Sequence, residues 1–213
     1  MRKIELIELV SDYLNGGDGP DDLKGRFHDQ VIKKHIEAAF NGIVFKTYME
    51  GKQYADYSVL DSWARNYPLT IQALSAGKGN VRLPYPPMQL PNNMGILQVA
   101  SSTDLSLVFA YRETNSNAVF AALEVGAVST KPFFYLEQNA TGSGIETHVL
   151  QLEKVPDGCT EVKVKMIVPL EVVDDFDQDM IHAGKEDMII AQLMDLLRTK
   201  PPEDNVNDNK ASR

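Results

Sequence analysis

The sequence predicts an α+β fold in which helices at both ends of the chain frame a β-rich middle. Apolar residues recur at helical spacing before residue 42, short alternating apolar runs follow Gly79, and a broad apolar stripe returns after Asp187. From these changes in pattern, the chain is predicted to divide into a helical N-terminal region at 1–76, a β-rich domain at 77–175, a C-terminal helix region at 176–200 and a flexible tail at 201–213.

Two amphipathic helices are expected to open the chain. The first carries an apolar stripe that ends at Gly16-Gly17, and its members are Ile4, Ile7, Val10 and Leu14. The second is predicted to begin near Pro20, whose fixed φ suits a first helical turn, and to end at Gly42. Residues 43–74 are rich in aromatic side chains of mixed spacing, which indicates a third helix or a helix followed by an extended segment.

The middle of the chain has the pattern of an antiparallel β-sandwich or a small barrel. Four prolines between Val81 and Pro91 exclude a helix and favour an extended course along a sheet edge. Alternating apolar residues then mark strands at 105–111 and 162–168, and a compact aromatic run marks another at 133–136. Gly142-Ser143-Gly144 is typical of a hairpin turn. Short strands separated by turn residues favour a sandwich-like sheet.

A C-terminal helix is expected from the apolar stripe between Met188 and Leu197, with acidic residues before it and Arg198 and Lys200 at its close. Pro201-Pro202 ends the pattern, and the remaining residues have almost no apolar side chain, which is typical of an arm-like or disordered tail. An internal core helix and a helix that packs on a neighbouring subunit explain the stripe about equally well. In the second case the interface residues are Met188, Ile190, Met194 and Leu197.

Composition limits the function classes. The formal net charge of −9 argues against a nucleic-acid surface, which needs clustered Lys and Arg. No apolar run approaches the roughly eighteen residues that a membrane helix requires, so no membrane role is expected. Cys159 is the single cysteine, and Glu5 places an acid where a secretory signal needs apolar residues. Both features favour a protein of the reducing cytoplasm.

One acidic segment has a spacing similar to that of a calcium loop. Asp175, Asp177, Asp179 and Glu186 occupy the first, third, fifth and twelfth positions of that pattern. The sixth position needs glycine for a sharp turn, and here it is Met180. A solvated acidic loop explains these residues better, because carboxylates also suit the N-terminus of the last helix. No metal or other cofactor is therefore expected.

No catalytic constellation is evident in the sequence. His28 and His35 lie seven residues apart rather than three or four, and His148 and His182 belong to no motif. Cys159 has no neighbouring histidine or helix N-terminus that would activate its thiol. We expect a protein that is not an enzyme, although a triad built from distant residues would leave little local trace.

Two stretches carry a more specific pattern. The first is bounded by prolines and contains Leu83-Pro84, Leu90-Pro91-Asn92, Gly95-Ile96 and Val99. The second runs from Phe134–Glu137 through Lys163–Pro169 to the last helix and its tail, Pro201–Asn209. Together with two opening helices, they resemble the neck or ring proteins of short-tailed bacteriophages, especially the crAss-like phages that infect gut Bacteroides.

The resemblance implies a virion structural protein that assembles in the host bacterial cytoplasm as a dodecameric ring. Such a ring lies beneath the portal protein, contacts other ring or tail proteins and connects the capsid to the tail, while DNA passes through it without specific binding. The resemblance carries no catalytic residues. The alternative from another class is a calcium-dependent carbohydrate-binding or hydrolytic β-sandwich protein, which would use the carboxylates between Asp174 and Asp179.

Overall fold

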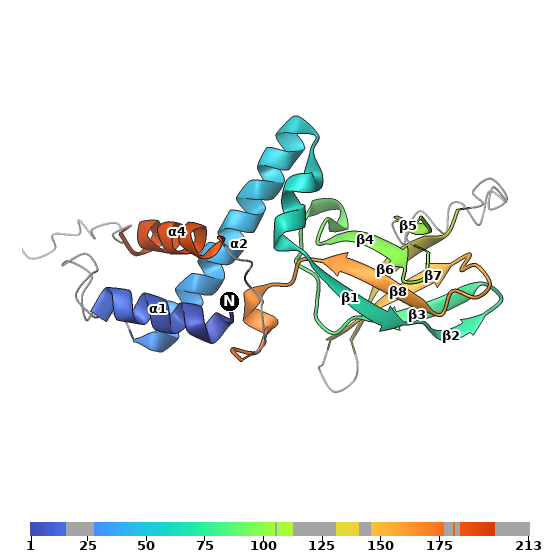
Figure 1. The fold of residues 1–213 in the computed structure, drawn as a ribbon, viewed down its shortest axis with the longest axis horizontal. Helices are drawn as coiled ribbons and strands as arrows, with labels where there is room; N and C mark the ends of the chain where they lie inside the picture. The colour runs from blue at the N-terminus through green and yellow to red at the C-terminus, as the bar shows by residue number, and fades with distance from the viewer. Residues whose placement is uncertain are drawn as a thin grey trace, which may run out of the picture. The chain divides into compact units, whose positions relative to one another are not determined.

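The computed structural model describes residues 1–15, 28–104, 106–112, 131–140, 146–176, 181 and 184–198. The chain forms two compact units (Figure 1). We call Met1–Ile43 with Asp174–Arg213 the helical unit, and Val44–Val173 the sheet unit. Helices, an eight-stranded mixed sheet and a C-terminal helix are present, which confirms the predicted α+β class.

Three helices build the helical unit: α1 (Lys3–Asn15), the first half of α2 (Asp29–Tyr54) and α4 (Glu186–Arg198). Each contributes residues three or four positions apart, so that its apolar side chains share one face. Burial of these faces, rather than intrinsic helix propensity, supplies most of the stability of such short helices. The fully buried residues are Leu6, Val10, Leu14, Ile32, Ile36, Ala39, Ile189 and Leu193.

Helix α2 is longer than the sequence suggested. The predicted end at Gly42 is wrong, because the helix continues to Tyr54, while the predicted start near Pro20 lies outside the described residues. Its buried stripe continues beyond the glycine through Ile43, Val44 and Tyr48. That burial outweighs the roughly 1 kcal/mol that a glycine costs in a helix interior.

Replacing Gly42 by alanine should stabilise the protein. Gly42 is exposed, and a Cβ at this position would meet no atom within 4 Å. Because alanine loses less backbone entropy than glycine in a helix, we expect the free energy of unfolding to rise by about 0.5–1 kcal/mol. Urea denaturation followed by circular dichroism measures the change. A lower free energy of unfolding would mean that α2 does not continue through this position.

The aromatic segment after residue 43 holds more than one kind of structure. Beyond α2 it contains the 3-10 helix η1 (Tyr57–Trp63) and the strands β1 (Arg65–Thr70) and β2 (Gln72–Ser75). The helical part therefore ends near residue 63 and not at 76 as predicted. Strand β1 lies at one end of the sheet order, where the missing N–H of Pro68 is tolerated.

Eight strands of the described residues form one sheet in the order β1-β8-β4-β5-β6-β7-β3-β2. The two ends of this order, β1 and β2, are separated along the chain only by Ile71. One extended stretch thus belongs to both edges, and the sheet nearly closes into a barrel. The other strands are β3 (Lys78–Arg82), β4 (Ile96–Ser101), β5 (Val108–Tyr111), β6 (Phe133–Ala140), β7 (Glu146–Glu153) and β8 (Glu161–Met166).

The sheet is mixed rather than purely antiparallel. Strands β5 and β6 are parallel, with Ala110 opposite Phe133, whereas the other pairs are antiparallel. A parallel pair needs a connection of a dozen or more residues, and residues 112–132 supply one. Strands β6 and β7 pair as far as Ala140 and Glu146, which confirms the predicted hairpin. Its turn residues lie outside the described part of the chain.

The burial pattern of strand β8 explains why this strand could be predicted from the sequence. Val162, Val164 and Met166 alternate with more exposed residues and are fully buried, as their period of two predicts. The proline-rich segment behaves differently, because β3 ends at Arg82, before the first of these prolines. The chain then runs without regular structure to the 3-10 helix η2 (Pro91–Asn93).

Candidate interaction surfaces

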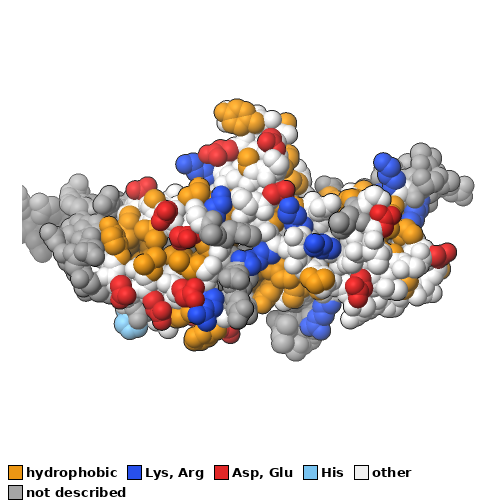
Figure 2. Space-filling view, viewed as in Figure 1, with side chains coloured by type: hydrophobic (Ala, Val, Ile, Leu, Met, Phe, Trp, Pro, Cys, Tyr) orange, Lys and Arg blue, Asp and Glu red, His pale blue; other side chains and the backbone are white. Residues whose placement is uncertain are grey.

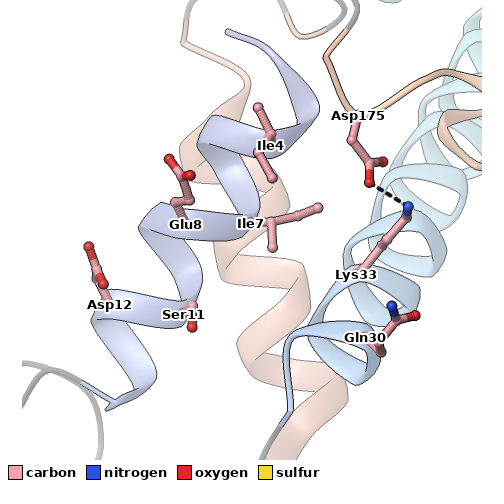
Figure 3. Close-up of a pocket in the computed structure, with 8 residues that line it drawn as sticks. All are labelled: Ile4, Ile7, Glu8, Ser11, Asp12, Gln30, Lys33 and Asp175. Carbon is pink, nitrogen blue, oxygen red and sulfur yellow. Dashed lines mark hydrogen bonds and ion pairs between the residues drawn. The ribbon is translucent and has the colours of Figure 1, made fainter.

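A groove with a volume of 490 Å³ lies in the helical unit between α1 and α2, beside Asp175 (Figure 3). We call it the α1–α2 groove. Helix α1 lines it with residues spaced by three or four positions, which share one helix face. Lys3, at the start of α1, contacts Glu37 of α2, whereas Gln30, at the start of α2, lines the groove together with Asp12 from the other end of α1, so the two helices run antiparallel along it. The lining residues are Ile4, Ile7, Glu8, Ser11, Asp12, Gln30, Lys33 and Asp175.

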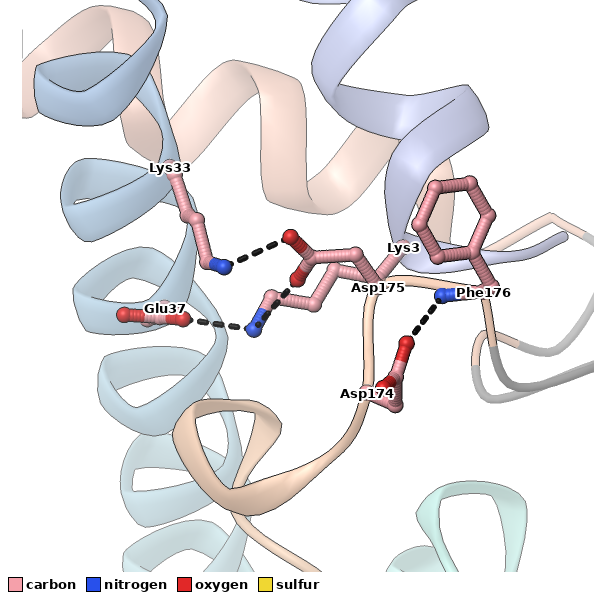
Figure 4. A network of polar contacts seen from close by, with 6 residues as sticks. All are labelled: Lys3, Lys33, Glu37, Asp174, Asp175 and Phe176. Carbon is pink, nitrogen blue, oxygen red and sulfur yellow. Dashed lines mark hydrogen bonds and ion pairs between the residues drawn. The ribbon is translucent and has the colours of Figure 1, made fainter.

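An ion-pair network borders this groove (Figure 4). The side chain of Lys3 is only 1% exposed, and its Nζ lies 2.6 Å from Glu37 Oε1 and 3.3 Å from Asp175 Oδ1. Lys33 Nζ donates a hydrogen bond of 2.6 Å to Asp175 Oδ2. A buried ammonium group is tolerated only when carboxylates compensate its lost hydration. Asp175 therefore connects the segment before α4 to both α1 and α2.

The environment of Asp175 favours its ionised form. Partial burial alone would raise the pKa of this carboxyl, but hydrogen bonds from Lys33 and Lys3, together with their positive charges, lower the pKa below its usual 3.8. The main chain adds a further link, because Ile4 N donates to the Asp175 carbonyl oxygen at 3.0 Å. The arrangement is that of a structural connection between segments.

The residues of the calcium-like pattern have separate surroundings. Asp175 is engaged by two lysines, whereas Glu186 begins α4. A hydrogen bond from its own backbone N–H, with others from Gly184 and Lys185, lowers the pKa of Glu186 despite some desolvation. Asp177 and Asp179 lie outside the described residues. Within the described ranges, no three His, Cys, Asp or Glu side chains form a group that could hold a metal ion.

The four predicted interface residues divide between core and surface. Met194 is buried, Ile190 and Leu197 are half-buried, and Met188 is 45% exposed. Helix α4 thus packs its main apolar face inside the helical unit, which the internal interpretation of its stripe predicts. Contact of the more exposed members with a neighbouring subunit stays a prediction.

The histidines and the cysteine occupy unrelated positions. His28 is exposed just before α2, and its Nδ1 accepts a hydrogen bond of 3.3 Å from Gln30 N. His35 is half-buried in α2 and His148 is buried in β7, while His182 lies outside the described residues. Cys159 is buried, and its Sγ donates to the Glu161 carbonyl oxygen at 3.7 Å. It is therefore a small packed residue, which lies just before β8 and not within a strand.

A hollow of 630 Å³ in the sheet unit was not predicted. We call it the sheet-unit hollow. Phe45 lines this hollow and is 50% exposed, and Met49, one helical turn further along α2, is exposed as well. Residues far apart in the sequence meet here, so no local pattern marks the site. Its lining residues have apolar side chains except for Gln89, although polar atoms make up a large part of its surface; they are Phe45, Pro87, Met88, Gln89, Leu90, Pro91, Ile96 and Leu136.

Two aromatic side chains, one in each unit, project into solvent. Phe176 of the helical unit is 70% exposed, and Tyr54, the last residue of α2, is 75% exposed. A hydrogen bond of 2.9 Å from Phe176 N to Asp174 Oδ1 fixes the turn that presents Phe176 (Figure 4). Figure 2 shows hydrophobic side chains on the surface of both units.

No protein-family model, no curated protein and no solved structure matches this chain. Among the described residues, no helix has both the length and the apolar character needed to cross a membrane. The surfaces of the two units are therefore the basis on which a function is proposed.

Proposed function

We propose that this protein is a non-enzymatic virion structural protein that forms a ring in the neck of a short-tailed bacteriophage and connects the portal and capsid to the tail. The observation that supports this most is the exposure of Phe176 together with a hollow, lined mainly by apolar residues, beside exposed Phe45 and Met49. Single exposed apolar residues are ordinary on protein surfaces. An aromatic projection and an open apolar recess are features that association with another molecule would bury.

The two features suit a contact between copies of the chain. A ring requires heterologous contacts, in which one surface of a subunit meets a different surface of the next subunit. In this proposal Phe176 of one copy enters the sheet-unit hollow of its neighbour and packs against Phe45 there. A buried aromatic side chain removes about 150–250 Å² from water and is a frequent anchor of interfaces. Residues such as Met188 would extend the contact.

Two single variants and their mixture test this proposal. Phe176→Ser removes the projection but keeps the hollow, while Phe45→Ser alters the hollow but keeps the projection. In sedimentation velocity, the wild-type chain should form a closed oligomer, and each variant alone should be monomeric. An equimolar mixture should form heterodimers, because only one functional contact is available to each pair. Val108→Thr, which changes an exposed strand residue and keeps its branched shape, is the matched control.

Two results of these experiments would contradict the proposed contact between Phe176 and the sheet-unit hollow. Variants that still assemble like the wild-type chain would contradict the proposed contact. A mixture that stays monomeric would show that the two residues do not meet across a heterologous interface. Electron microscopy of the wild-type protein with purified portal and tail components then tests its place in the neck, where binding to neither component would contradict the neck assignment.

The charge distribution is compatible with a structural part that DNA passes without being bound. The sequence of the helical unit contains 11 Lys and Arg against 18 Asp and Glu, a formal charge of −7. Such a surplus repels phosphate and attracts basic protein surfaces. By contrast, no described residue favours the calcium-dependent β-sandwich alternative, because Asp175 already neutralises Lys3 and Lys33.

A further inference from the structure

We infer that the α1–α2 groove binds a basic amphipathic helix of a partner protein. The inference is independent of ring formation, because the groove lies wholly within the helical unit and involves neither Phe176 nor the sheet-unit hollow. Three properties of the groove carry it: an apolar base, an acidic wall whose carboxylates form no ion pair with the described residues, and a length that suits a helix.

The base of the groove is apolar. Ile7 is buried and points from α1 toward α2, and Ile4, one turn before it, is half-buried (Figure 3). An apolar side chain of a partner placed over them would bury its own surface and that of the isoleucines. This burial supplies affinity but does not fix the orientation of the partner. Polar groups on the walls must therefore supply the orientation and the choice of partner.

The α1 wall is acidic. Glu8 and Asp12 are four residues apart, so they lie on one face of the helix, and both are exposed. Neither carboxylate forms an ion pair with a described residue. The one cationic side chain of the lining, Lys33, is neutralised by Asp175. Among the described residues, the groove lining therefore has two carboxylates without a cationic partner beside an apolar base.

The dimensions suit a short helix. The lining of α1 extends from Ile4 to Asp12, which corresponds to about 12 Å of helix, or a little more than two turns. A partner helix in this groove would place Lys or Arg at positions three or four apart opposite Glu8 and Asp12. Its apolar residues, one turn away, would meet Ile4. This is the helix-in-groove mode of recognition, with charge selecting a basic partner.

Fluorescence anisotropy with the full chain tests the inference. The probe is a labelled synthetic helix of about fourteen residues, with Leu on one face and Lys on the other. The first comparison peptide has Glu in place of Lys, and the second has the same composition but a scrambled order without an apolar face. We expect the Leu/Lys helix to bind and both comparison peptides to bind at least ten-fold more weakly.

Matched variants locate the site. Glu8→Gln with Asp12→Asn should raise the Kd for the basic helix about five- to ten-fold, because two exposed charge contacts are lost. Glu50→Gln with Asp157→Asn removes the same charge from exposed positions of the sheet unit and should change the Kd less than two-fold. Equal effects of the two double variants, or equal binding of the scrambled peptide, would show non-specific attraction and overturn the inference.

Discussion

Replacing Asp175 by alanine is expected to lower the free energy of unfolding by about 2–3 kcal/mol. The substitution removes one of the two described carboxylates that contact Lys3, which is almost fully buried, and it removes the carboxylate that pairs with Lys33. The value lies below that for a fully buried pair, because Asp175 and Lys33 are partly exposed to solvent. Urea denaturation of both proteins at neutral pH measures the difference.

Asp174→Ala is the matched control for this substitution. The neighbouring carboxylate accepts a hydrogen bond from Phe176 N and is exposed, so its loss should cost less than about 1 kcal/mol. Equal losses in the two variants would contradict the role that we assign to the Lys3–Asp175–Lys33 contacts.

The same contacts predict a pH dependence. The pKa of Asp175 is lower in the folded protein than its usual 3.8, so the folded state favours the ionised form. The stabilisation is complete above the unfolded-state pKa and is lost as the pH falls through the lower folded-state pKa. The stability difference between wild type and Asp175→Asn should therefore be constant from neutral pH to about 5 and shrink below about 4. A difference that grows on acidification would contradict this sign.

Replacing Gly95 by alanine should be the most damaging change in the sheet unit. A Cβ at this position would collide with the Met88 carbonyl group, with its carbon at 3.0 Å. Neither segment can move away easily, because Met88 N donates to Ile167 O and Ile167 N donates to Gly95 O, both at 2.8 Å. We expect a loss of about 3 kcal/mol or more, or a chain that does not fold.

Susceptibility to proteolysis tests whether the loss of stability in Gly95→Ala arises in the sheet unit. Limited proteolysis should cut the Gly95→Ala protein within the sheet unit far faster than the wild-type chain. Gly42→Ala, where a Cβ meets no atom within 4 Å, is the control and should be at least as resistant as the wild type. A Gly95→Ala protein as stable as the control would mean that the segment around Met88 does not pack on Gly95.

Much of the fold could be predicted because the apolar residues of several helices and strands recur at a regular spacing. Helix α1 and strand β8 bury most of the side chains that their spacing marks, and helix α4 buries the middle of its stripe at Ile189, Leu193 and Met194. The parallel pairing of β5 with β6 and the near closure through Ile71 could not be predicted, since both depend on contacts between distant segments. The prediction ended helix α2 too early, because glycine is common at the ends of helices. The burial of side chains beyond Gly42, which keeps the chain helical, depends on tertiary contacts.

The surfaces were harder to predict than the elements. Asp175 was singled out for its spacing to other acids, whereas its actual partners are Lys3 and Lys33, which are distant in the sequence. The acidic pair on α1 could have been found from its four-residue spacing, but the opposite wall comes from α2. Phe176 lies in an irregular segment, where no period distinguishes an exposed side chain from a buried one.

Negative-stain electron microscopy of the purified 213-residue chain tests the central claim most directly. We expect closed rings of one kind of subunit with a single rotational symmetry, and Phe176→Ser should abolish them. Particles that remain monomeric at micromolar concentration would contradict this expectation.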